Sequence, residues 1–541
     1  MRRLVLVSML AGLAGPSLAH AASPEACAPD AAPDKYRMLR QVTLDLWGRI
    51  PTYDEYRALD DQAELTGAAI DAMFTSEEYF AQLRSYFRHL IWGGLPDDFG
   101  VTGSQRRMTR QATTNLYFVG NLRSTFRGRA DVTCLDQAQT SFDADGRPVP
   151  ISTFVDPTCS GATHTCKQEG YVMVTPYWSA TPLKVCAYDA QALAVGVGAG
   201  SPTCTPYTID AGCGCGPNLR NCTPGIGDAN HTAIRDALAE ESTRIFDAVV
   251  RSGRSYFDTF TTRETYVNGP LVQFYKNLAG ADIKIEQGGA VGYDPLMPAA
   301  LPTLAFGDVD TWVPVTRPEG HAGVLTTAGF QLRLGSNRGR VNRWYSAFRC
   351  EPFVPPAGGL PADTGGEPDP NLRTRNGCAG CHNTIEPAAA HFARWRTQGQ
   401  FGFFPPTVVN ASGPHAGCST GCTSGACKSF CDAYFITTRN STAQQQADYM
   451  SWPQASLYLD AAETAAIDRG PAGLVDDADE QAKVASCAVR TLSEQLLGRD
   501  LTPDETLKWL PEATATFAAS GYKFTSLYRA LLDLPQYRQT R

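Results

Sequence analysis

The sequence predicts a mainly α protein, in which several helical segments are separated by irregular, disulfide-rich inserts. Apolar residues recur at helical spacing near both ends of the 541-residue chain. Most of the 17 cysteines gather instead in stretches rich in glycine, proline, serine and threonine, where long helical periodicity is lost. A chain of this length forms several domains around a large buried core.

The first residues have the pattern of an export signal. Met1-Arg2-Arg3 precedes an apolar run from Leu4 to Leu18, and Ala19-His20-Ala21 is a small-x-small cleavage site. We therefore expect residues 1–21 to be a signal peptide and the chain to be exported, to the periplasm or the cell surface, where cysteines oxidise. Since no later segment reaches about 18 uninterrupted apolar residues, no transmembrane segment is expected in the mature chain.

Residues 22–125 are expected to form an N-terminal helical domain. The apolar face of its first helix comprises Tyr36, Leu39, Val42 and Leu46. Thr52 with Glu55, and Thr75 with Glu78, both have the spacing of a capping box, in which two side chains satisfy free backbone N–H groups at a helix start. Helices are therefore predicted to begin at these two positions.

Residues 126–228 form a cysteine-rich insert. Its eight cysteines are Cys134, Cys159, Cys166, Cys186, Cys204, Cys213, Cys215 and Cys222. In an exported segment that is poor in apolar periodicity, this number predicts a disulfide framework in place of a large core. Eight cysteines can pair in 105 ways, so the connectivity stays open.

Two further helical regions flank residues 321–486. Residues 229–320 are expected to be a helical middle domain, whose aromatic series from Tyr256 to Tyr275 is interpreted as core. Residues 487–541 are expected to be a C-terminal helical domain. A helix start is predicted there at Thr502-Pro503-Asp504-Glu505.

A haem-attachment motif marks the remaining segment, residues 321–486. Cys378-Ala-Gly-Cys381-His382 has the CxxCH pattern, in which both thiols form thioethers with the haem vinyl groups and the histidine binds the iron. It predicts a cytochrome c-like domain with one covalent haem c on Cys378, Cys381 and His382. The alternatives are a redox disulfide, whose βαβ context is missing, and a zinc site, which lacks a suitable second ligand pair.

The other cysteines of this segment lie in a loop, residues 411–432, and are expected to close two local bridges. They are Cys418, Cys422, Cys427 and Cys431. Without the haem pair an odd number of cysteines remains, so at least one is free, intermolecular or reduced. The candidates are Cys27, Cys350 and Cys487.

The sixth iron ligand decides between electron transfer and reactivity, because methionine blocks the position that oxygen or peroxide would take. Met450 is the only methionine after the motif and is the leading candidate. His391 is too close in sequence to His382 to reach the opposite haem face easily. Other histidines that tertiary folding could bring there are His89, His231, His321 and His415. Candidate neighbours of the ring are Tyr449 and Trp452 for packing, and Arg394 and Arg396 for the propionates.

Several short stretches follow one another in the same order as in one family, which the chain therefore resembles. They are Leu44 to Thr52, Phe257-Asp258, Tyr266 to Gly269, Gly323 to Thr326, Cys378 to His382 with Ile385-Glu386-Pro387, and Leu497-Gly498-Arg499. The family comprises large secreted proteins of planctomycete and myxobacterial type, with a cytochrome c-like segment between domains of unknown function. The resemblance implies an exported, mainly helical protein with one covalent haem and no securely known reaction. The chain departs from the family after Pro387, where Ala388 to Trp395 replaces a glycine-rich, acidic stretch.

Charge and motif content exclude several functional classes. The formal net charge of −8 and the scattered basic residues give no electrostatic support for nucleic-acid binding. The G-x-S-x-G match at Gly417-Cys418-Ser419-Thr420-Gly421 lies in the cysteine-rich loop and lacks the strand-to-helix context of a nucleophile elbow. The chain has no H-E-x-x-H helix and no phosphate-binding loop that follows a strand. Hydrolase and nucleotide-dependent functions therefore have no support.

Three functions remain. The first is electron transfer through the single haem to a redox partner protein. The second is a haem-dependent oxidoreductase with an open sixth position, which acts on an extracellular substrate. The third is a surface binding protein, in which the disulfide-rich insert carries recognition and the haem is structural.

Overall fold

Helices dominate the structure, with about 48% of the described residues helical and 10% in strands, so the protein is mainly α as predicted. The computed structural model describes residues 34–95, 106–119, 126–192, 213–225, 228–279, 282–286, 289–292, 301–354, 369–397, 401–404, 406, 409–418 and 425–539. The predicted signal peptide and Cys27 lie outside these ranges.

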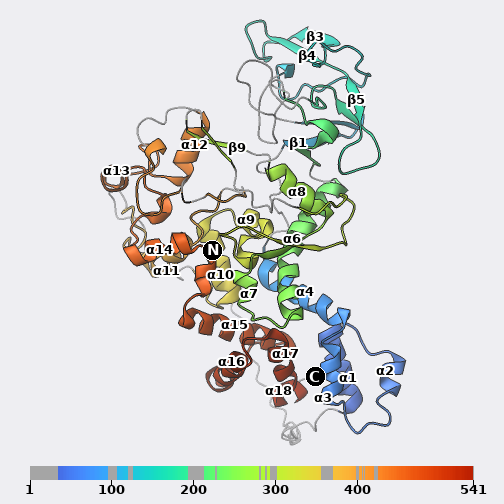
Figure 1. Cartoon of the computed structure of the whole chain (residues 1–541), viewed down its shortest axis with the longest axis vertical. Coiled ribbons are helices and arrows are strands. Elements are labelled where there is room, and N and C mark those ends of the chain that lie inside the picture. The colour runs from blue at the N-terminus through green and yellow to red at the C-terminus, as the bar shows by residue number, and fades with distance from the viewer. Residues whose placement is uncertain are drawn as a thin grey trace, which may run out of the picture.

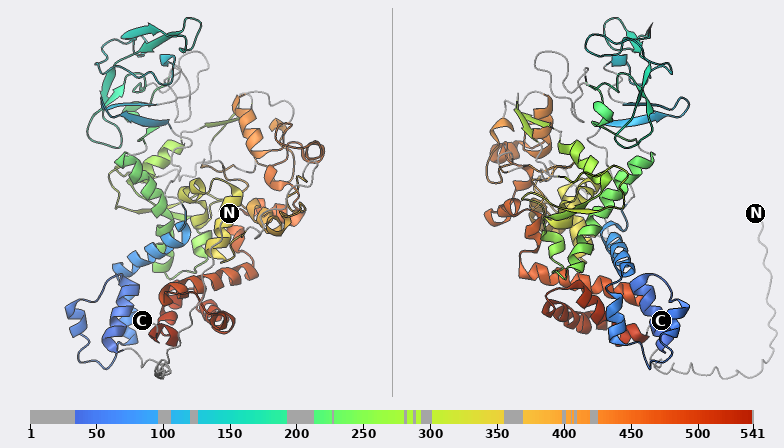
Figure 2. Two further views of the ribbon diagram at one scale, coloured as in Figure 1. Left: turned by 180° about the vertical axis from the view of Figure 1, so that it is seen from behind. Right: turned by 45° about the vertical axis from the view of Figure 1, so that its right-hand side comes forward.

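The molecule is elongated, with different kinds of structure at its two ends (Figures 1 and 2). The cysteine-rich strands form one end, and helices from both chain termini form the other. Helices of the middle domain connect the two ends, and the segment with the haem motif forms a lobe at their side (Figure 1).

The N-terminal region is a helical unit whose elements are α1 (Lys35–Trp47), α2 (Tyr53–Arg57), α3 (Gly67–Met73) and α4 (Glu77–Trp92). The capping box of Thr52 and Glu55 is confirmed at the start of α2. The one predicted at Thr75 is wrong, because the Thr75 hydroxyl donates back to the carbonyl of Ala72. Ser76 caps α4 instead and accepts a hydrogen bond from the Tyr79 N–H.

Residues 106–119, which were expected to be helical, form an antiparallel hairpin of β1 (Arg106–Gln111) and β2 (Leu116–Val119). Their connection ends at Asn115, which has a φ of 56°. Asparagine tolerates this left-handed conformation at little cost, so the short turn is favoured. The hairpin belongs to the sheet of the cysteine-rich insert, and its two strands lie before the predicted boundary of that insert.

The cysteine-rich insert has a five-stranded sheet in the order β5-β6-β2-β1-β7 and a separate hairpin. Its other strands are β3 (Ser152–Val155), β4 (Thr165–Gln168), β5 (Tyr171–Val174), β6 (Leu183–Cys186) and β7 (Cys222–Thr223). The predicted disulfide framework is confirmed by three bridges, Cys134–Cys186, Cys159–Cys166 and Cys215–Cys222. Cys213 is also disulfide-bonded.

The middle of the molecule is organised around the long helix α6 (Ala229–Arg251). The elements that follow are α7 (Asp258–Thr261), β8 (Glu264–Val267), α8 (Gly269–Ala279), β9 (Asp282–Glu286), β10 (Gly289–Gly292), β11 (Val313–Thr316), α9 (Ala328–Arg333) and α10 (Asn337–Phe348). Tyr256, Phe260 and Tyr275 are all buried, which confirms that the aromatic series belongs to the core.

One buried polar cluster lies within this core. Glu241 of α6 is fully buried and accepts hydrogen bonds from the hydroxyls of Tyr275 (2.8 and 2.9 Å) and Thr265 (2.7 Å). Burial raises the pKa of Glu241, and that of Tyr275 lies well above its usual value for the same reason. The cluster satisfies its own polar atoms and fixes α8 and β8 against α6.

The last third of the chain is helical. It contains α11 (Ala379–Ala390), α12 (Gly425–Tyr434), α13 (Ala443–Tyr449), α14 (Ala461–Arg469), α15 (Ala478–Leu497), α16 (Leu510–Ala519), α17 (Phe524–Leu532) and α18 (Pro535–Gln539). Cys418 and Cys431 form one of the expected local bridges. The side chains of Cys422 and Cys427 lie outside the description.

Cys350 and Cys487, two of the three candidates for an unpaired cysteine, are bonded to each other. The bridge joins the residues after α10 to α15, across 137 residues of chain. That prediction is therefore wrong for both residues. Sequence position isolates them, whereas the packing of α10 against α15 brings them together.

The helical units at the two termini share a local arrangement that we call the Arg–Glu clasp. In the first, α1 ends at Gly48 with a φ of 68°, and the guanidinium of Arg49 binds both carboxylate oxygens of Glu55 at 2.8 and 2.9 Å. Glu55 also accepts a hydrogen bond from the backbone N–H of Thr52. The clasp thus ties the end of one helix to the start of the next.

The second clasp repeats the first with the same residue types at the same spacing. Gly498 ends α15 with a φ of 67°, and Arg499 binds both oxygens of Glu505 at 2.8 Å. The Thr502 N–H donates to Glu505, and the Glu505 N–H donates to Thr502, so the predicted helix start is confirmed. The two terminal units are therefore copies of one local design, which we did not identify in the sequence.

The two copies pack against each other through opposite ends of the chain. The Gln41 amide donates to the carbonyl of Tyr537 (2.8 Å), whose hydroxyl donates to Asp45 (2.8 Å). On the other side, the hydroxyls of Tyr86 and Thr491 lie 2.9 Å apart. The α1 helix of the first copy thereby contacts α18 of the second, while α4 contacts α15.

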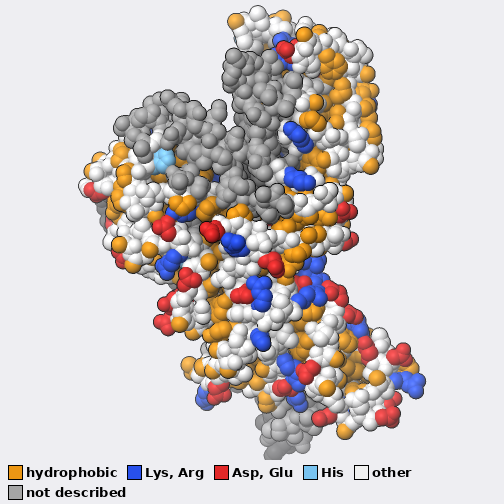
Figure 3. Space-filling view, in the orientation of Figure 1, with side chains coloured by type: hydrophobic (Ala, Val, Ile, Leu, Met, Phe, Trp, Pro, Cys, Tyr) orange, Lys and Arg blue, Asp and Glu red, His pale blue; other side chains and the backbone are white. Residues whose placement is uncertain are grey.

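Within the described ranges, no helix combines the length and apolar character needed to cross a bilayer. On the face shown in Figure 3, basic and acidic side chains are interspersed over the helical part, and neither sign forms a large patch of its own. On this face, the arrangement agrees with the scattered charge seen in the sequence.

Candidate haem-attachment site

The CxxCH motif lies at the start of α11. Cys378 directly precedes the helix, and its carbonyl accepts hydrogen bonds from the N–H groups of Cys381 (3.2 Å) and His382 (3.0 Å). One helical turn therefore separates the two cysteines, which places them on the same side of the helix. A single rigid turn thus presents both thiols and the histidine.

Both thiols of the motif are free and half-buried. Every other cysteine whose side chain the structure describes is disulfide-bonded. The motif therefore does not form the disulfide that was its main alternative to haem attachment. Two neighbouring free thiols, in a chain otherwise linked by disulfides, are the state from which thioethers to a haem can form.

The imidazole of His382 is oriented by a carboxylate. Its Nδ1 lies 2.5 Å from Oε1 of Glu386, one turn further along α11, and Arg338 of α10 donates to the same oxygen at 2.8 Å. The carboxylate fixes the proton on Nδ1, which leaves the lone pair of Nε2 for a metal. In the described part of the chain, Nε2 has no hydrogen-bond partner. These residues fit the demands of haem c, with two free thiols beside an imidazole in the required tautomer.

The chain just before the motif is anchored to α14. The guanidinium of Arg373 binds both oxygens of Glu463 at 2.7 Å and the carbonyl of Tyr458 at 2.6 Å. Bidentate pairs of this kind restrict orientation as well as distance. The approach of the chain to Cys378 is thus held in place from outside α11.

Met450 lies at the C-terminal end of α13 and is half-buried. The preceding residue, Tyr449, contacts the ring of Tyr458 edge-on at 5.5 Å, and Arg373 binds the carbonyl of Tyr458. A chain of contacts therefore links Met450 to the segment that enters the motif. Its role as sixth ligand stays a prediction.

His391, the other nearby candidate, is directed elsewhere. Its ring is buried, and Nδ1 lies 2.6 Å from the carbonyl of Gly470, after the end of α14. Burial lowers the pKa of His391 to about 4, so the ring is neutral at pH 7. Its observed role is to hold the end of α11 against the chain beyond α14.

The residues predicted to surround the haem ring mostly have partners within the protein. Arg394 is buried and donates to the carbonyl of Val409 and to Asp468, which disfavours a role with a propionate. Tyr449 and Trp452 contact each other edge-on at 6.1 Å. The carbonyl of Arg396 accepts a hydrogen bond from Arg340.

The four other histidines considered as candidates lie in separate parts of the fold. His89 of α4 lines a cleft between α4 and α15, and His231 is buried on α6. His321 is buried beside Trp395, with ring centroids 5.1 Å apart, and its pKa is well below the usual value because of burial. His415 packs against Phe435. None of these positions is on α11 or on the segment that anchors it.

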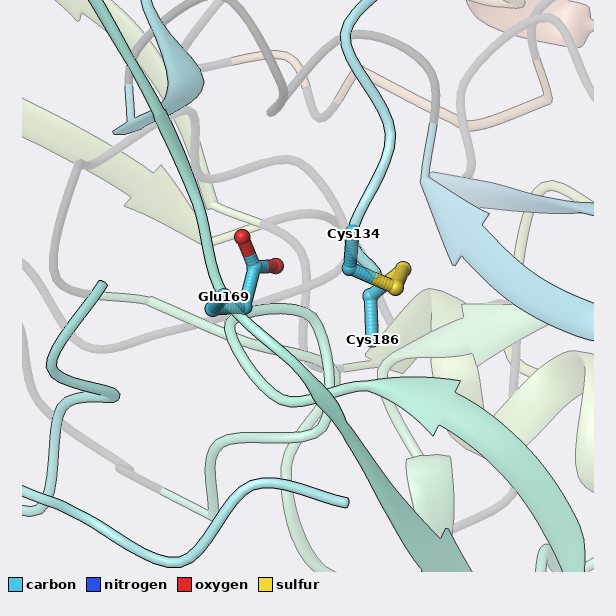
Figure 4. A group of neighbouring side chains, drawn as sticks. All are labelled: Cys134, Glu169 and Cys186. Carbon is cyan, nitrogen blue, oxygen red and sulfur yellow. A yellow bond between two sulfur atoms is a disulfide. The ribbon is translucent and has the colours of Figure 1, made fainter. Parts of the chain in front are cut away.

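Folding brings three potential metal ligands together in the cysteine-rich insert. Sγ atoms of Cys134 and Cys186 and a carboxylate oxygen of Glu169 lie within 4.8 Å of one another (Figure 4). The two sulfurs are joined in a disulfide, however, and Glu169 forms a buried ion pair with Arg127. Neither sulfur is available as a thiolate, so this group is a structural contact.

The interaction of His382, Glu386 and Arg338 was not predicted from the sequence. The signal for its first half is a His-x-x-x-Glu spacing, which places both side chains on one face of a helix. The contribution of Arg338 depends on the packing of α10 against α11 and has no local signal.

Comparison with family models, with curated proteins and with solved structures finds no match to this chain.

Proposed function

We propose that this chain is an exported c-type haem protein that transfers electrons through one covalent haem. The observation that carries the proposal is the pair of free thiols at Cys378 and Cys381, in a chain whose other described cysteines are bonded. His382, which follows them, presents Nε2 in the tautomer that binds iron. A disulfide-exchange motif would need the two thiols but would have no use for this oriented imidazole.

The haem, when bound, supplies a one-electron redox centre. Cys378 and Cys381 would fix it by thioether bonds, and His382 would bind the iron through Nε2. Glu386 holds the proton on Nδ1 and fixes the ring orientation. Met450 is the proposed ligand on the opposite face.

The proposed location is the periplasm or the cell surface. The five disulfides with both partners described are typical of a protein that folds in an oxidising compartment. The N-terminal sequence has the pattern of a signal peptide, which would direct the chain there. A redox partner protein of the same compartment would exchange electrons with the haem.

The proposal is tested by expressing the full chain in a bacterial host that has a cytochrome c maturation system. We expect a c-type pyridine haemochrome from the wild type, and none from the double variant Cys378→Ala, Cys381→Ala. The matched control is Cys418→Ala with Cys431→Ala, which removes a disulfide and should retain haem. Wild-type protein without haem, from a host that matures a reference cytochrome, would refute the proposal.

A second measurement identifies the opposite ligand. If Met450 binds the iron, the reduced wild-type protein should show little spectral change with carbon monoxide, and Met450→Ala should become high-spin. An unchanged spectrum in Met450→Ala would remove this residue. A wild-type protein that binds carbon monoxide readily would favour the haem-dependent oxidoreductase over the electron carrier.

A further inference from the structure

We propose that Glu386 and Arg338 set the reduction potential of this haem by controlling how strongly His382 donates to the iron. Glu386 is a positioning residue in this scheme, because it acts on the iron only through the imidazole. The inference rests on the proposed function. It adds two residues that shift the reduction potential of the haem in opposite directions.

The geometry places Glu386 at one atom of His382, the Nδ1 nitrogen. Glu386 follows His382 by one helical turn, so the fold of α11 alone brings its carboxylate to Nδ1 at 2.5 Å. The His382 and Glu386 side chains are each 20% exposed. The hydrogen bond is thus formed where bulk water weakens it less than at an open surface.

A carboxylate is a stronger acceptor than a backbone carbonyl for the Nδ1 proton. When it attracts that proton, the ring gains anionic character, and Nε2 becomes a better electron donor. Stronger donation stabilises ferric over ferrous iron, which lowers the reduction potential. Glu386 is therefore expected to hold the potential below the value that the same ligands would give without it.

Arg338 opposes this effect from the neighbouring helix. Its Nε donates to Oε1 of Glu386 at 2.8 Å, the same oxygen that contacts His382. A second donor on that oxygen withdraws charge from the bond to Nδ1, and the guanidinium adds positive charge near the iron ligand. Both contributions favour the ferrous state. Glu386 and Arg338 should consequently have effects of opposite sign.

The test is a spectroelectrochemical titration of the full-length holoprotein in three variants. Glu386→Gln should raise the midpoint potential by at least a tenfold change in the reduction equilibrium, which is about 59 mV for one electron. Arg338→Gln should lower the potential. Glu505→Gln, which removes an equally Arg-paired carboxylate in the C-terminal unit, should leave it unchanged.

Haem content, measured first by pyridine haemochrome, separates this inference from the proposed function. Wild-type protein without haem would refute the proposed function. Haem-loaded Glu386→Gln with the wild-type potential would overturn the inference and leave the proposed function intact. A shift of the same sign in Glu386→Gln and Arg338→Gln would also overturn it, since structural damage near the haem predicts no opposition. If Glu386→Gln fails to accumulate, Arg338→Gln alone decides by the sign of its shift.

Discussion

Removing either Arg–Glu clasp should destabilise the protein by about 1–2 kcal/mol at neutral pH. In Glu505→Gln, Arg499 loses its bidentate partner and the Thr502 N–H loses a carboxylate acceptor. The clasp lowers the pKa of Glu505 to about 2, mainly through the hydrogen bonds from Arg499. Against a usual value of 4.5, this corresponds to about 3 kcal/mol. Because Arg499 is 39% exposed and water screens the ion pair, the expected loss is smaller than this figure, about 1–2 kcal/mol.

The stabilisation by the clasp should increase with pH, because it requires an ionised Glu505. The folded pKa of Glu505 lies below the unfolded one, so ionisation favours the folded state. The contribution is complete above pH 4.5 and is lost as the pH falls towards 2. The difference in stability between wild type and Glu505→Gln should therefore shrink by more than half between pH 7 and pH 3.

Thermal unfolding followed by circular dichroism at several pH values provides the assay. Glu55→Gln should behave like Glu505→Gln, because the pKa of Glu55 is also lowered to about 2 by an equivalent arginine. The double variant should show the sum of both losses at pH 7, since the clasps share no partners. A Glu505→Gln protein as stable as wild type at pH 7, or a deficit that keeps its full size at pH 2.5, would refute the reasoning.

Three further predictions concern the interior. Tyr275→Phe removes a donor from the buried Glu241 carboxylate and should cost about 1–3 kcal/mol in unfolding free energy, measured by urea titration; an equally stable variant would contradict this. Replacing Cys350 and Cys487 by alanine opens a 137-residue loop and should lower stability by up to about 5 kcal/mol, whereas an unchanged melting temperature would show that the bridge contributes nothing. The folded pKa of His391, about 4, lies below its unfolded value, so the stabilisation by the neutral ring is complete above pH 6.5 and is lost as the pH falls to 4. His391→Gln should not show this loss of stability between pH 6.5 and pH 4. A variant whose stability depends on pH as in the wild type would contradict this prediction.

Features that depend on a few neighbouring residues were predictable from the sequence. The capping boxes at Thr52 and Thr502 formed because, at a helix start, a hydroxyl and a carboxylate three residues apart can each reach the backbone N–H of the other residue. The Thr75 prediction failed at this same level, because the adjacent Ser76 offered a competing hydroxyl. The CxxCH turn is likewise local, and it presents its thiols and imidazole as the spacing predicts.

Features that depend on packing were not predictable. The Cys350–Cys487 bridge requires α10 and α15 to meet, which no local pattern indicates. The strands β1 and β2 are too short for an alternating pattern to predict them against the expected helix, and they gain stability from the sheet around them. The Arg338 contact to Glu386 depends in the same way on where two helices cross. The residues of the Arg–Glu clasp occur at the same spacing in both terminal segments of the sequence. Only the structure shows that the two units that contain them pack against each other.

The pairing of the two terminal units affects how the protein is made. The contact between Gln41 and Tyr537 joins residues 496 positions apart, so the first unit is synthesised long before its partner exists. The part of its surface that contacts α15 and α18 stays uncovered until those helices are synthesised, and closing so long a loop is entropically costly. A chain interrupted at any earlier point would keep that surface exposed to proteases and chaperones. The order of synthesis therefore makes the docking of the two units a late step in folding.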